Sequence, residues 1–164
     1  MQFTEHLDQV FQRLGSNGVF LTVKSGERVN TMTIGWGLIG IQWRLPIFTV
    51  LVRPSRFTFE LIETATDFTV SVPKDNSLNN ALTLCGTKSG RNLDKFKAAG
   101  LVLKPARKVI TPVIDGNCFT YECRILYKTP LNSNEVAPSV VKSSYSGGDF
   151  HTLYFGEIVD CYDL

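Results

Sequence analysis

The chain has 164 residues and carries 17 lysines and arginines against 15 aspartates and glutamates, a net charge of +2 at pH 7. This length fits one domain with a sizeable core, and a composition of 43% hydrophobic and 20% charged residues excludes fibrous and disordered classes. A surplus of two positive charges is far below what binding to a nucleic-acid backbone requires. We therefore expect a single globular domain over residues 1–164 that does not bind nucleic acid.

Features of the sequence also bear on where the protein works. The longest uncharged apolar run, residues 32–41, is about half of the roughly 20 residues that a membrane-spanning helix needs. The N-terminus carries an early acid, Glu5, and lacks the basic and apolar regions of a secretory signal. The four cysteines form neither a CxxC pair nor the dense pattern of a disulfide-rich domain. We expect a cytoplasmic protein with free thiols and no membrane segment.

The first predicted element is an amphipathic helix over residues 4–14, where apolar residues recur at helical spacing between a capping Thr4 and Gly15. From residue 18 onwards, β-branched and aromatic residues are punctuated by turns, which predicts strands. Six strands are expected, at residues 19–23, 32–41, 48–52, 68–72, 119–127 and 153–159. Three short helices are expected between them, at residues 55–63, 77–84 and 92–99. A serine caps each of the first two, and the third runs from a capping Asn92 to a closing Gly100.

The order of these elements predicts the fold class. Regular crossover helices do not separate the strands, so a doubly wound parallel sheet is disfavoured. We expect an α+β, mainly β fold, with a closed or partly closed antiparallel β-barrel and short peripheral helices. Residues 129–149 carry two prolines and a Gly147-Gly148 pair in a polar segment that is unusually long for a loop in a compact domain. This segment is expected to be an insertion, a lid or a partner contact.

Two glycine-rich segments match nucleotide-binding patterns only in part. Residues 35–40 fit GxGxxG, but the residues that follow contain Pro46 and no helical stripe, so no helix N-terminus is available for a pyrophosphate. Glycines within a strand more often mark a bulge, or a place where a ligand or another backbone comes close. Residues 86–91 lack the adjacent glycine and lysine of a P-loop. We therefore expect neither a dinucleotide fold nor a P-loop.

Two turns combine cations and hydroxyl groups with the start of a predicted helix, a combination that favours an anion. The turn at residues 53–58 carries Arg53 and Arg56, whose guanidinium groups match phosphate oxygens. The turn at residues 86–91 carries Lys88 and Arg91. Each turn alone also fits ordinary surface charges on a capped helix. Together they favour a ligand that bears a phosphate.

Other candidate residues give weaker signals. His6 and His151 lack the spacing of a zinc site, so no metal is expected. We interpret His6 as a surface residue of the first helix, whereas His151, at the start of the last strand, fits either a ligand-facing or a structural role. Cys85 fits a small buried residue better than a nucleophile. No Ser-His-Asp arrangement or pair of catalytic carboxylates can be identified from spacing.

Four motifs then occur in a specific order: residues 30–37 (NTMTIGWG), 53–58 (RPSRFT), 68–73 (FTVSVP) and 85–91 (CGTKSGR) with 94–96 (DKF). In this order the chain closely resembles the flavin reductase and flavoredoxin family. The resemblance covers about residues 18–101 and resumes at residues 121–123 and 151–159. It implies an FMN-binding split barrel, usually a homodimer in which each flavin lies near the subunit interface.

The resemblance also implies roles for individual residues. It places four side chains beside the isoalloxazine ring and the ribityl chain, namely Asn30, Met32, Thr33 and Trp36. It places seven at the ribityl or phosphate end, namely Ser55, Arg56, Thr58, Ser89, Gly90, Arg91 and Lys95. Three more residues of the same motifs complete the expected cofactor-binding set, namely Thr31, Arg53 and Cys85. His151 matches a late histidine near the reactive face of the ring and is the candidate catalytic residue.

Three departures from the family pattern bear on function. Asn92 stands where many relatives have an acid, the 129–149 segment precedes His151, and the chain ends at Leu164 where many relatives continue into a tail that covers the flavin. We expect an FMN-dependent oxidoreductase that passes electrons from a reduced nicotinamide or another donor to flavin. Two alternatives stay open: a flavoredoxin-like carrier that exchanges electrons with a ferredoxin-type partner without turnover of its own, and a flavin-binding protein without a redox partner.

Overall fold

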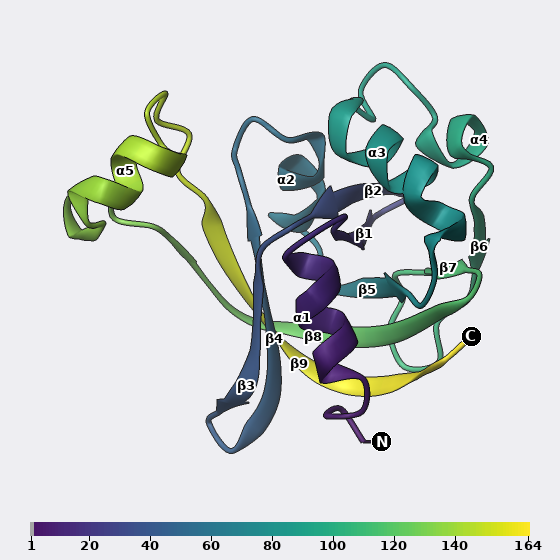
Figure 1. Cartoon of the computed structure of the whole chain (residues 1–164). Coiled ribbons are helices and arrows are strands. Elements are labelled where there is room, and N and C mark those ends of the chain that lie inside the picture. Colours follow the sequence, from purple (N-terminus) through teal and green to yellow (C-terminus); the bar gives the residue numbers. More distant parts are fainter. Residues whose placement is uncertain (1) are drawn as a thin grey trace.

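The computed structural model describes residues 2–164 (Figure 1). The strands are β1 (Val19–Ser25), β2 (Arg28–Ile34), β3 (Gly37–Gln42), β4 (Leu45–Val52), β5 (Asp67–Pro73), β6 (Val102–Lys104), β7 (Val113–Asp115), β8 (Cys118–Pro130) and β9 (Thr152–Asp163). The helices are α1 (Leu7–Leu14), α2 (Phe57–Ile62), α3 (Asn79–Thr87), α4 (Lys95–Ala99) and α5 (Pro138–Ser144), with 3-10 turns η1 (Asn76–Leu78) and η2 (Ser133–Glu135).

The main sheet is a barrel that is open on one side. Its seven strands follow the order β2-β1-β5-β8-β9-β4-β3, and neighbours run antiparallel. The two edge strands β2 and β3 are consecutive in the chain but do not pair with each other in the sheet described for residues 2–164. The chain turns at Gly35 and Trp36 and crosses this gap, as Figure 1 shows on the left of the barrel. The expected mainly β split barrel is confirmed.

Alternation along the strands builds two apolar clusters. Val19 and Leu21 of β1 face the barrel interior, whereas Phe20 between them faces a second cluster under α3 and α4. All seven residues of β5 are buried, because the segment before β7 covers its outer face, where the Thr69 hydroxyl donates to the Pro112 carbonyl at 2.8 Å. The interior cluster is rich in Val, Leu, Ile and Phe, so hydrophobic burial dominates the stability of the barrel.

One strand prediction was wrong. Residues 32–41 were expected to form a single strand, but β2 ends at Ile34 and β3 begins at Gly37, at opposite edges of the sheet. The polypeptide can cross there because Gly37 lacks a side chain: a Cβ at this position would lie 2.9 Å from the Phe48 ring. The short strands β6 and β7 were missed, since three residues are too few for a periodic signal.

Several helix boundaries also differ from the prediction. The first helix begins at Leu7 instead of Thr4, because the backbone of His6 is left-handed (φ 62°) and turns the chain into the helix. The second begins at Phe57, and Ser55 does not cap it. The helix expected at 77–84 is divided into η1 and α3. The last begins at Lys95 and is capped by Asp94 instead of Asn92, whereas Gly100 ends it in a left-handed conformation as expected.

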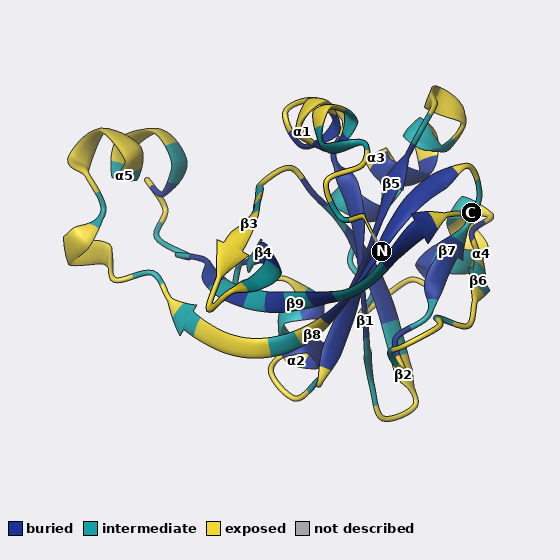
Figure 2. Ribbon diagram, turned by 90° about the horizontal axis from the view of Figure 1, so that it is seen from below, coloured by how far each residue is buried: buried dark blue, intermediate teal, exposed yellow. Residues whose placement is uncertain are grey.

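The segment expected to be a long loop at 129–149 is structured in part. β8 and β9 stay paired as far as Pro130 and Thr152, with β4 on the other side of β9. Residues 131–150 between β8 and β9, called the arm, carry η2 and α5 (Figure 1). None of the seven residues of α5, all of which the structure describes, is buried. Figure 2 shows α5 in yellow and teal, well apart from the dark blue barrel. The arm therefore has no core of its own.

The turn between β3 and β4 consists of two residues in an unusual backbone conformation. Trp43 and Arg44 are both left-handed, with φ of 54° and 61°. The Trp43 ring packs beside Tyr127 and Phe155.

Within residues 2–164, no helix is long and apolar enough to cross a membrane. All four cysteines are buried free thiols, as expected from their spacing.

Candidate functional site

Two adjoining hollows form one groove beside β2. The first, the Trp36 pocket, measures about 500 Å³ and is lined by Met32, Thr33, Ile34, Gly35, Trp36, Leu51, Arg53, Arg56 and His151. The second, the Lys95 pocket, measures about 430 Å³ and is lined by Asn30, Met32, Ser55, Arg56, Phe57, Thr58, Cys85, Thr87, Lys88, Ser89, Gly90, Arg91 and Lys95. The pockets share Met32 and Arg56, so a single elongated ligand can occupy both.

The Trp36 pocket is built around exposed aromatic surface. Trp36 lies in the turn between the two edge strands, and its side chain is 46% exposed. Its ring centroid lies 5.0 Å from that of His151 and 6.3 Å from that of Tyr145. Met32, Ile34 and Leu51 add apolar surface to the lining. A large apolar ring held open to solvent in a pocket is suited to contact a flat ligand.

His151 is buried at the wall of this pocket. Its side chain is 8% exposed, and its Nδ1 lies 2.7 Å from the Tyr145 hydroxyl of the arm. Burial, reinforced by the Arg53 guanidinium, lowers the pKa of His151 to about 4, so the imidazole is neutral at physiological pH. The structure thus brings His151 to the same groove as the early motifs, although more than 100 positions separate it from Trp36.

The Lys95 pocket is cationic. Arg56, Lys88, Arg91 and Lys95 line it, and among the residues that the structure describes its lining contains no Asp or Glu. Lys95 is 4% exposed, and its Nζ donates to the carbonyls of Thr31 at 3.0 Å and Cys85 at 2.8 Å. Burial lowers the pKa of Lys95. The ammonium therefore links β2 to α3 while it places a positive charge beneath the pocket.

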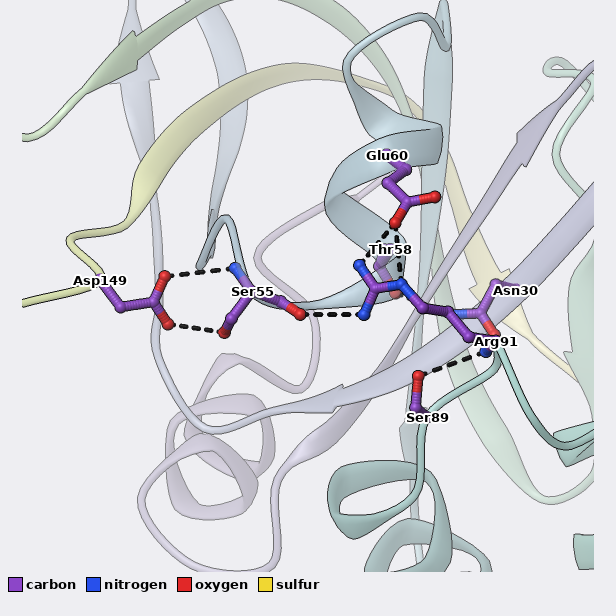
Figure 3. A network of polar contacts seen from close by, with 7 residues as sticks. All are labelled: Asn30, Ser55, Thr58, Glu60, Ser89, Arg91 and Asp149. Carbon is purple, nitrogen blue, oxygen red and sulfur yellow. Dashed lines mark hydrogen bonds and ion pairs between the residues drawn. The ribbon is translucent and has the colours of Figure 1, made fainter.

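Polar contacts join the two anion-favouring turns (Figure 3). Arg91 donates to the Glu60 carboxylate from Nε at 2.8 Å and to the Ser55 carbonyl from Nη1 at 3.1 Å, and its backbone N–H donates to the Ser89 hydroxyl at 3.2 Å. On the other side, the backbone N–H and the hydroxyl of Ser55 both donate to Asp149 of the arm, at 3.2 and 2.6 Å. This network connects the arm, α2 and the glycine turn.

Arg53 and Arg56 differ in how freely they meet a ligand. Arg53 donates to the arm carbonyls of Ser144 and Asp149, at 2.9 and 3.1 Å. Arg56 lies between the pockets and makes one long contact, 3.5 Å, to the Gly86 carbonyl. Arg53 therefore holds the arm at the rim, whereas Arg56 is the cation best placed to turn toward a ligand.

Two close approaches shape the Lys95 pocket. The buried amide of Asn30 donates to the Thr58 hydroxyl at 2.8 Å, which fixes β2 against α2. Gly90 presses against this pair: a Cβ at Gly90 would overlap the Asn30 side-chain oxygen and lie 2.8 Å from the Phe57 ring. Only glycine fits here, so the 89–91 turn lies directly over the pocket.

Most of the residues expected in the site line the groove, with one exception. The Thr31 side chain is fully buried and points away, with its hydroxyl donating to the Leu21 carbonyl at 3.2 Å, so only its carbonyl serves the site through Lys95. Ile34, Gly35, Leu51, Phe57, Thr87 and Lys88 also line the groove, and their nearness to the motifs was the available signal. Tyr145 was missed because a lone tyrosine in a polar segment carries no signal. Within residues 2–164, no group of three His, Cys, Asp or Glu residues could hold a metal.

The geometry describes a ligand with two different ends. One end of the groove offers apolar and aromatic surface with a neutral histidine, and the other offers cations and hydroxyl groups without carboxylates. Flat apolar surface suits an aromatic ring system, and the cationic end suits a phosphate. The residues present therefore fit a flavin nucleotide, which joins a flat ring system to a phosphate.

Comparison with known proteins also points to flavin binding. The model of the family described as flavin reductase like domain matches residues 11–163. An uncharacterised protein of Archaeoglobus fulgidus is 30% identical over 140 residues, which cover 85% of this chain and 68% of that protein. The chain spans 56% of the length of two other curated relatives, from Pyrococcus abyssi and Escherichia coli.

Three solved structures share the fold. The FMN-binding protein from Thermus thermophilus with bound 1-cyclohex-2-enone is 25% identical, with a TM-score of 0.69 over 89% of this chain and 69% of that one. The flavoredoxin of Desulfovibrio vulgaris (Miyazaki F) is 22% identical, with a TM-score of 0.70 over 90% and 69%. The NADH:FAD oxidoreductase of Streptomyces globisporus C-1027 is 19% identical, with a TM-score of 0.65 over 90% and 75%.

Proposed function

Because the chain belongs to the flavin reductase like domain family, we propose that it is an FMN-dependent oxidoreductase of the cytoplasm that passes electrons from a reduced nicotinamide or another donor to flavin. The observation that carries this proposal is the cationic Lys95 pocket next to the aromatic Trp36 pocket. When bound, the flavin supplies the electron-transfer chemistry. The side chains of this protein bind it, orient it and shield it from water.

The Lys95 pocket favours a single phosphate at the end of the ligand. Arg56 and Lys88 provide charge-assisted donors at the pocket, and the buried Lys95 adds a fixed positive charge. Ser89, Thr87 and Thr58 add hydroxyl groups to the lining. FMN ends in such a phosphate, whereas riboflavin lacks it and FAD extends beyond it, so FMN is the proposed cofactor.

The Trp36 pocket would hold the ring system, with His151 at its wall. A neutral imidazole can donate to an acceptor atom of the ring edge or of a nicotinamide amide without adding a charge to the site. Among the residues that the structure describes, the lining of this pocket contains no acid and base pair, and flavin chemistry does not require one. In this proposal His151 is the one catalytic residue of the chain.

We also propose that the protein is a homodimer. Large apolar side chains lie exposed on β3, on the β3–β4 turn and on the outer part of β8, namely Leu38, Ile41, Trp43, Leu126 and Tyr127. This strip begins two residues after Trp36, so a second copy bound there would also cover the open side of the Trp36 pocket. Light scattering with FMN bound is expected to give twice the mass of one chain, and a monomer with full flavin occupancy would contradict the dimer.

A titration of the flavin-free protein tests the proposed cofactor. FMN fluorescence should be quenched at a Kd about 100-fold lower than that of riboflavin, since two charge-assisted bonds of about 1.5 kcal/mol each are lost without the phosphate. Equal affinities would exclude the phosphate site. FAD in the same assay separates the mononucleotide from the dinucleotide.

Turnover separates the enzyme from the carrier. Steady-state oxidation of NADH or NADPH with free flavin as acceptor is expected of the oxidoreductase. A flavoredoxin-like carrier, the alternative function, would show no such turnover but would be reduced anaerobically by a ferredoxin-type donor. A protein that binds FMN and responds to neither donor would exclude both functions.

A further inference from the structure

The arm sends one side chain into the molecule. Of residues 131–150, all of which the structure describes, only Tyr145 is buried, at 4% exposure. Tyr145 is the C-cap of α5, and its backbone N–H donates to the Val141 carbonyl at 2.9 Å. An arm that serves only as a connection would not need a buried phenol, so the contacts of this ring define what the arm does.

Three contacts hold the Tyr145 ring and its hydroxyl in place. Phe150 stacks on it with centroids 4.5 Å apart and planes at 12°, and the Arg53 guanidinium lies 5.0 Å from the ring centroid. The hydroxyl then reaches His151 Nδ1 at 2.7 Å. Arg53 also binds the backbone on both sides of the ring through Ser144 and Asp149. The phenol therefore has little freedom to leave the imidazole.

The partners of this hydrogen bond favour one direction. Within residues 2–164, the Tyr145 hydroxyl has one hydrogen-bond partner, His151 Nδ1. The imidazole is neutral, so Nδ1 either accepts the phenol proton or donates its own. The Arg53 guanidinium over the ring is a donor only, and the nearby Ser144 and Asp149 carbonyls already accept from it, so donation to Nδ1 is what gives the phenol proton a partner. A neutral imidazole that accepts at Nδ1 carries its proton on Nε2.

We propose that Tyr145 is a positioning residue, which holds His151 in the tautomer that carries its proton on Nε2 and so presents a neutral donor to the ligand in the Trp36 pocket. His151 Nε2 makes no hydrogen bond within residues 2–164, and the imidazole lines this pocket, so the Nε2 proton is available to an acceptor atom of a bound ring or of a nicotinamide amide. This role rests on the proposed function for its redox consequence. The tautomer itself is a property of the chain without ligand.

The charged groups around His151 support a neutral donor. Arg53 after β4 and Arg56 before α2 oppose protonation of the imidazole, and Asp149 of the arm favours it. Asp149 is engaged by the backbone N–H and hydroxyl of Ser55, which reduces its pull on the ring. Donation from Tyr145 adds a further preference for the neutral form, because an accepting Nδ1 must be unprotonated.

Nitrogen NMR of the imidazoles tests the proposal without any flavin. The chain has only two histidines, so a His6→Gln variant leaves His151 as the sole imidazole. At pH 7 the parent should show a protonated Nε2 and an unprotonated Nδ1. Tyr145→Phe keeps the ring, its stacking and the arm contacts but removes the donor, and it should give a mixture of tautomers.

The redox consequence is measured on the same variant loaded with FMN. Tyr145→Phe should keep the FMN Kd within about two-fold, because the Lys95 pocket is unchanged, and should slow flavin reduction about ten-fold in stopped flow. Tyr154→Phe is the matched control: it removes another buried phenol contact, 2.6 Å to Glu63, outside the groove. It should leave the tautomer and the rate as in the parent.

The outcomes separate this inference from the proposed function. A Tyr145→Phe protein with the parent tautomer would overturn the positioning role, whether or not flavin binds. A shifted tautomer with an unchanged reduction rate would overturn its part in catalysis. A shifted tautomer in a protein that binds no FMN would confirm the hydrogen bond and overturn the proposed function instead.

Discussion

The two ends of the groove are built in opposite ways. The Lys95 end is formed by β2, α2, α3 and the 89–91 turn, which buried contacts such as Lys95 to Thr31 and Asn30 to Thr58 hold together. The Trp36 end is closed by the arm, which rests on one buried side chain, Tyr145, and on surface contacts of Arg53 and Ser55. We therefore expect ligand affinity to depend on the rigid end, and reactivity to depend on a segment that can be loosened separately.

The largest effect is expected at the rigid end. Lys95→Met removes a buried cation and leaves the carbonyls of Thr31 and Cys85 without a donor, so the free energy of unfolding should fall by about 3 kcal/mol and FMN affinity by at least about ten-fold. Denaturant unfolding and flavin titration measure both. Lys97→Met on the same helix is the control, since Lys97 is 88% exposed. Equal effects of the two variants would show that Lys95 does not act as a buried cation at this end of the groove.

At the other end, the pH dependence of stability should report His151. Its pKa is about 4 in the folded state against about 6.5 when unfolded, so the unfolded chain binds the extra proton between these values. Stability should therefore be fully present above pH 6.5 and fall by at most about 3 kcal/mol as the pH drops toward 4. Urea unfolding of the parent and His151→Gln across this range gives the difference. Parallel curves would contradict a buried neutral imidazole.

Removal of the imidazole should separate binding from reaction. His151→Ala is expected to retain most FMN affinity, because the phosphate contacts lie at the Lys95 end, and to lose about ten-fold to 100-fold in the rate of flavin reduction. Stopped-flow reduction and a potentiometric titration of the loaded proteins provide the measurement. If the rate and the midpoint potential were both unchanged, His151 would have no part in the reaction.

The smallest effect should be confined to the arm. Ser55→Ala removes the hydrogen bond from the Ser55 hydroxyl to Asp149. The free energy of local opening of the arm should therefore fall by about 1 kcal/mol, while the barrel keeps its stability. Hydrogen exchange of the amides at residues 145–150 would reveal this. Ser16→Ala, which removes a local bond to the Gln12 carbonyl, is the control. A fall in FMN affinity instead would return Ser55 to the role implied by the resemblance, contact with the ligand.

The rigid end could be predicted from the sequence better than the arm. Its residues lie in short motifs with turn and capping chemistry, and the structure brings Arg56, Thr58, Ser89 and Gly90 to one pocket. Local pattern could not show that Thr31 faces the core, because neighbouring strand residues alternate and both faces of β2 are covered. The break between β2 and β3 at Gly35 was missed for a similar reason. The residues of a strand and the residues where the chain crosses between the two sheet edges are equally apolar.

Tyr145 could not be predicted at all. Its importance depends on its contacts with Arg53, Phe150 and His151, and nothing in the polar sequence of the arm marks one tyrosine as buried. The short α5 was missed because none of its residues packs into a core that would give a helical pattern. Long-range contacts decide both, and local propensity carries no information about them.

The turn of Trp43 and Arg44 has a consequence for engineering the protein. Both residues adopt a backbone conformation that costs a non-glycine residue about 1 kcal/mol, and Asn-Gly is the pair that a two-residue hairpin of this type prefers. Replacing them would relieve the strain and, in the same step, remove an exposed indole from the proposed contact between subunits. Thermal tolerance and self-association would then change in opposite directions. The hairpin tip is thus a position where a more heat-resistant monomer could be selected, and the Trp36 pocket of that monomer would lack the cover proposed to come from a second copy.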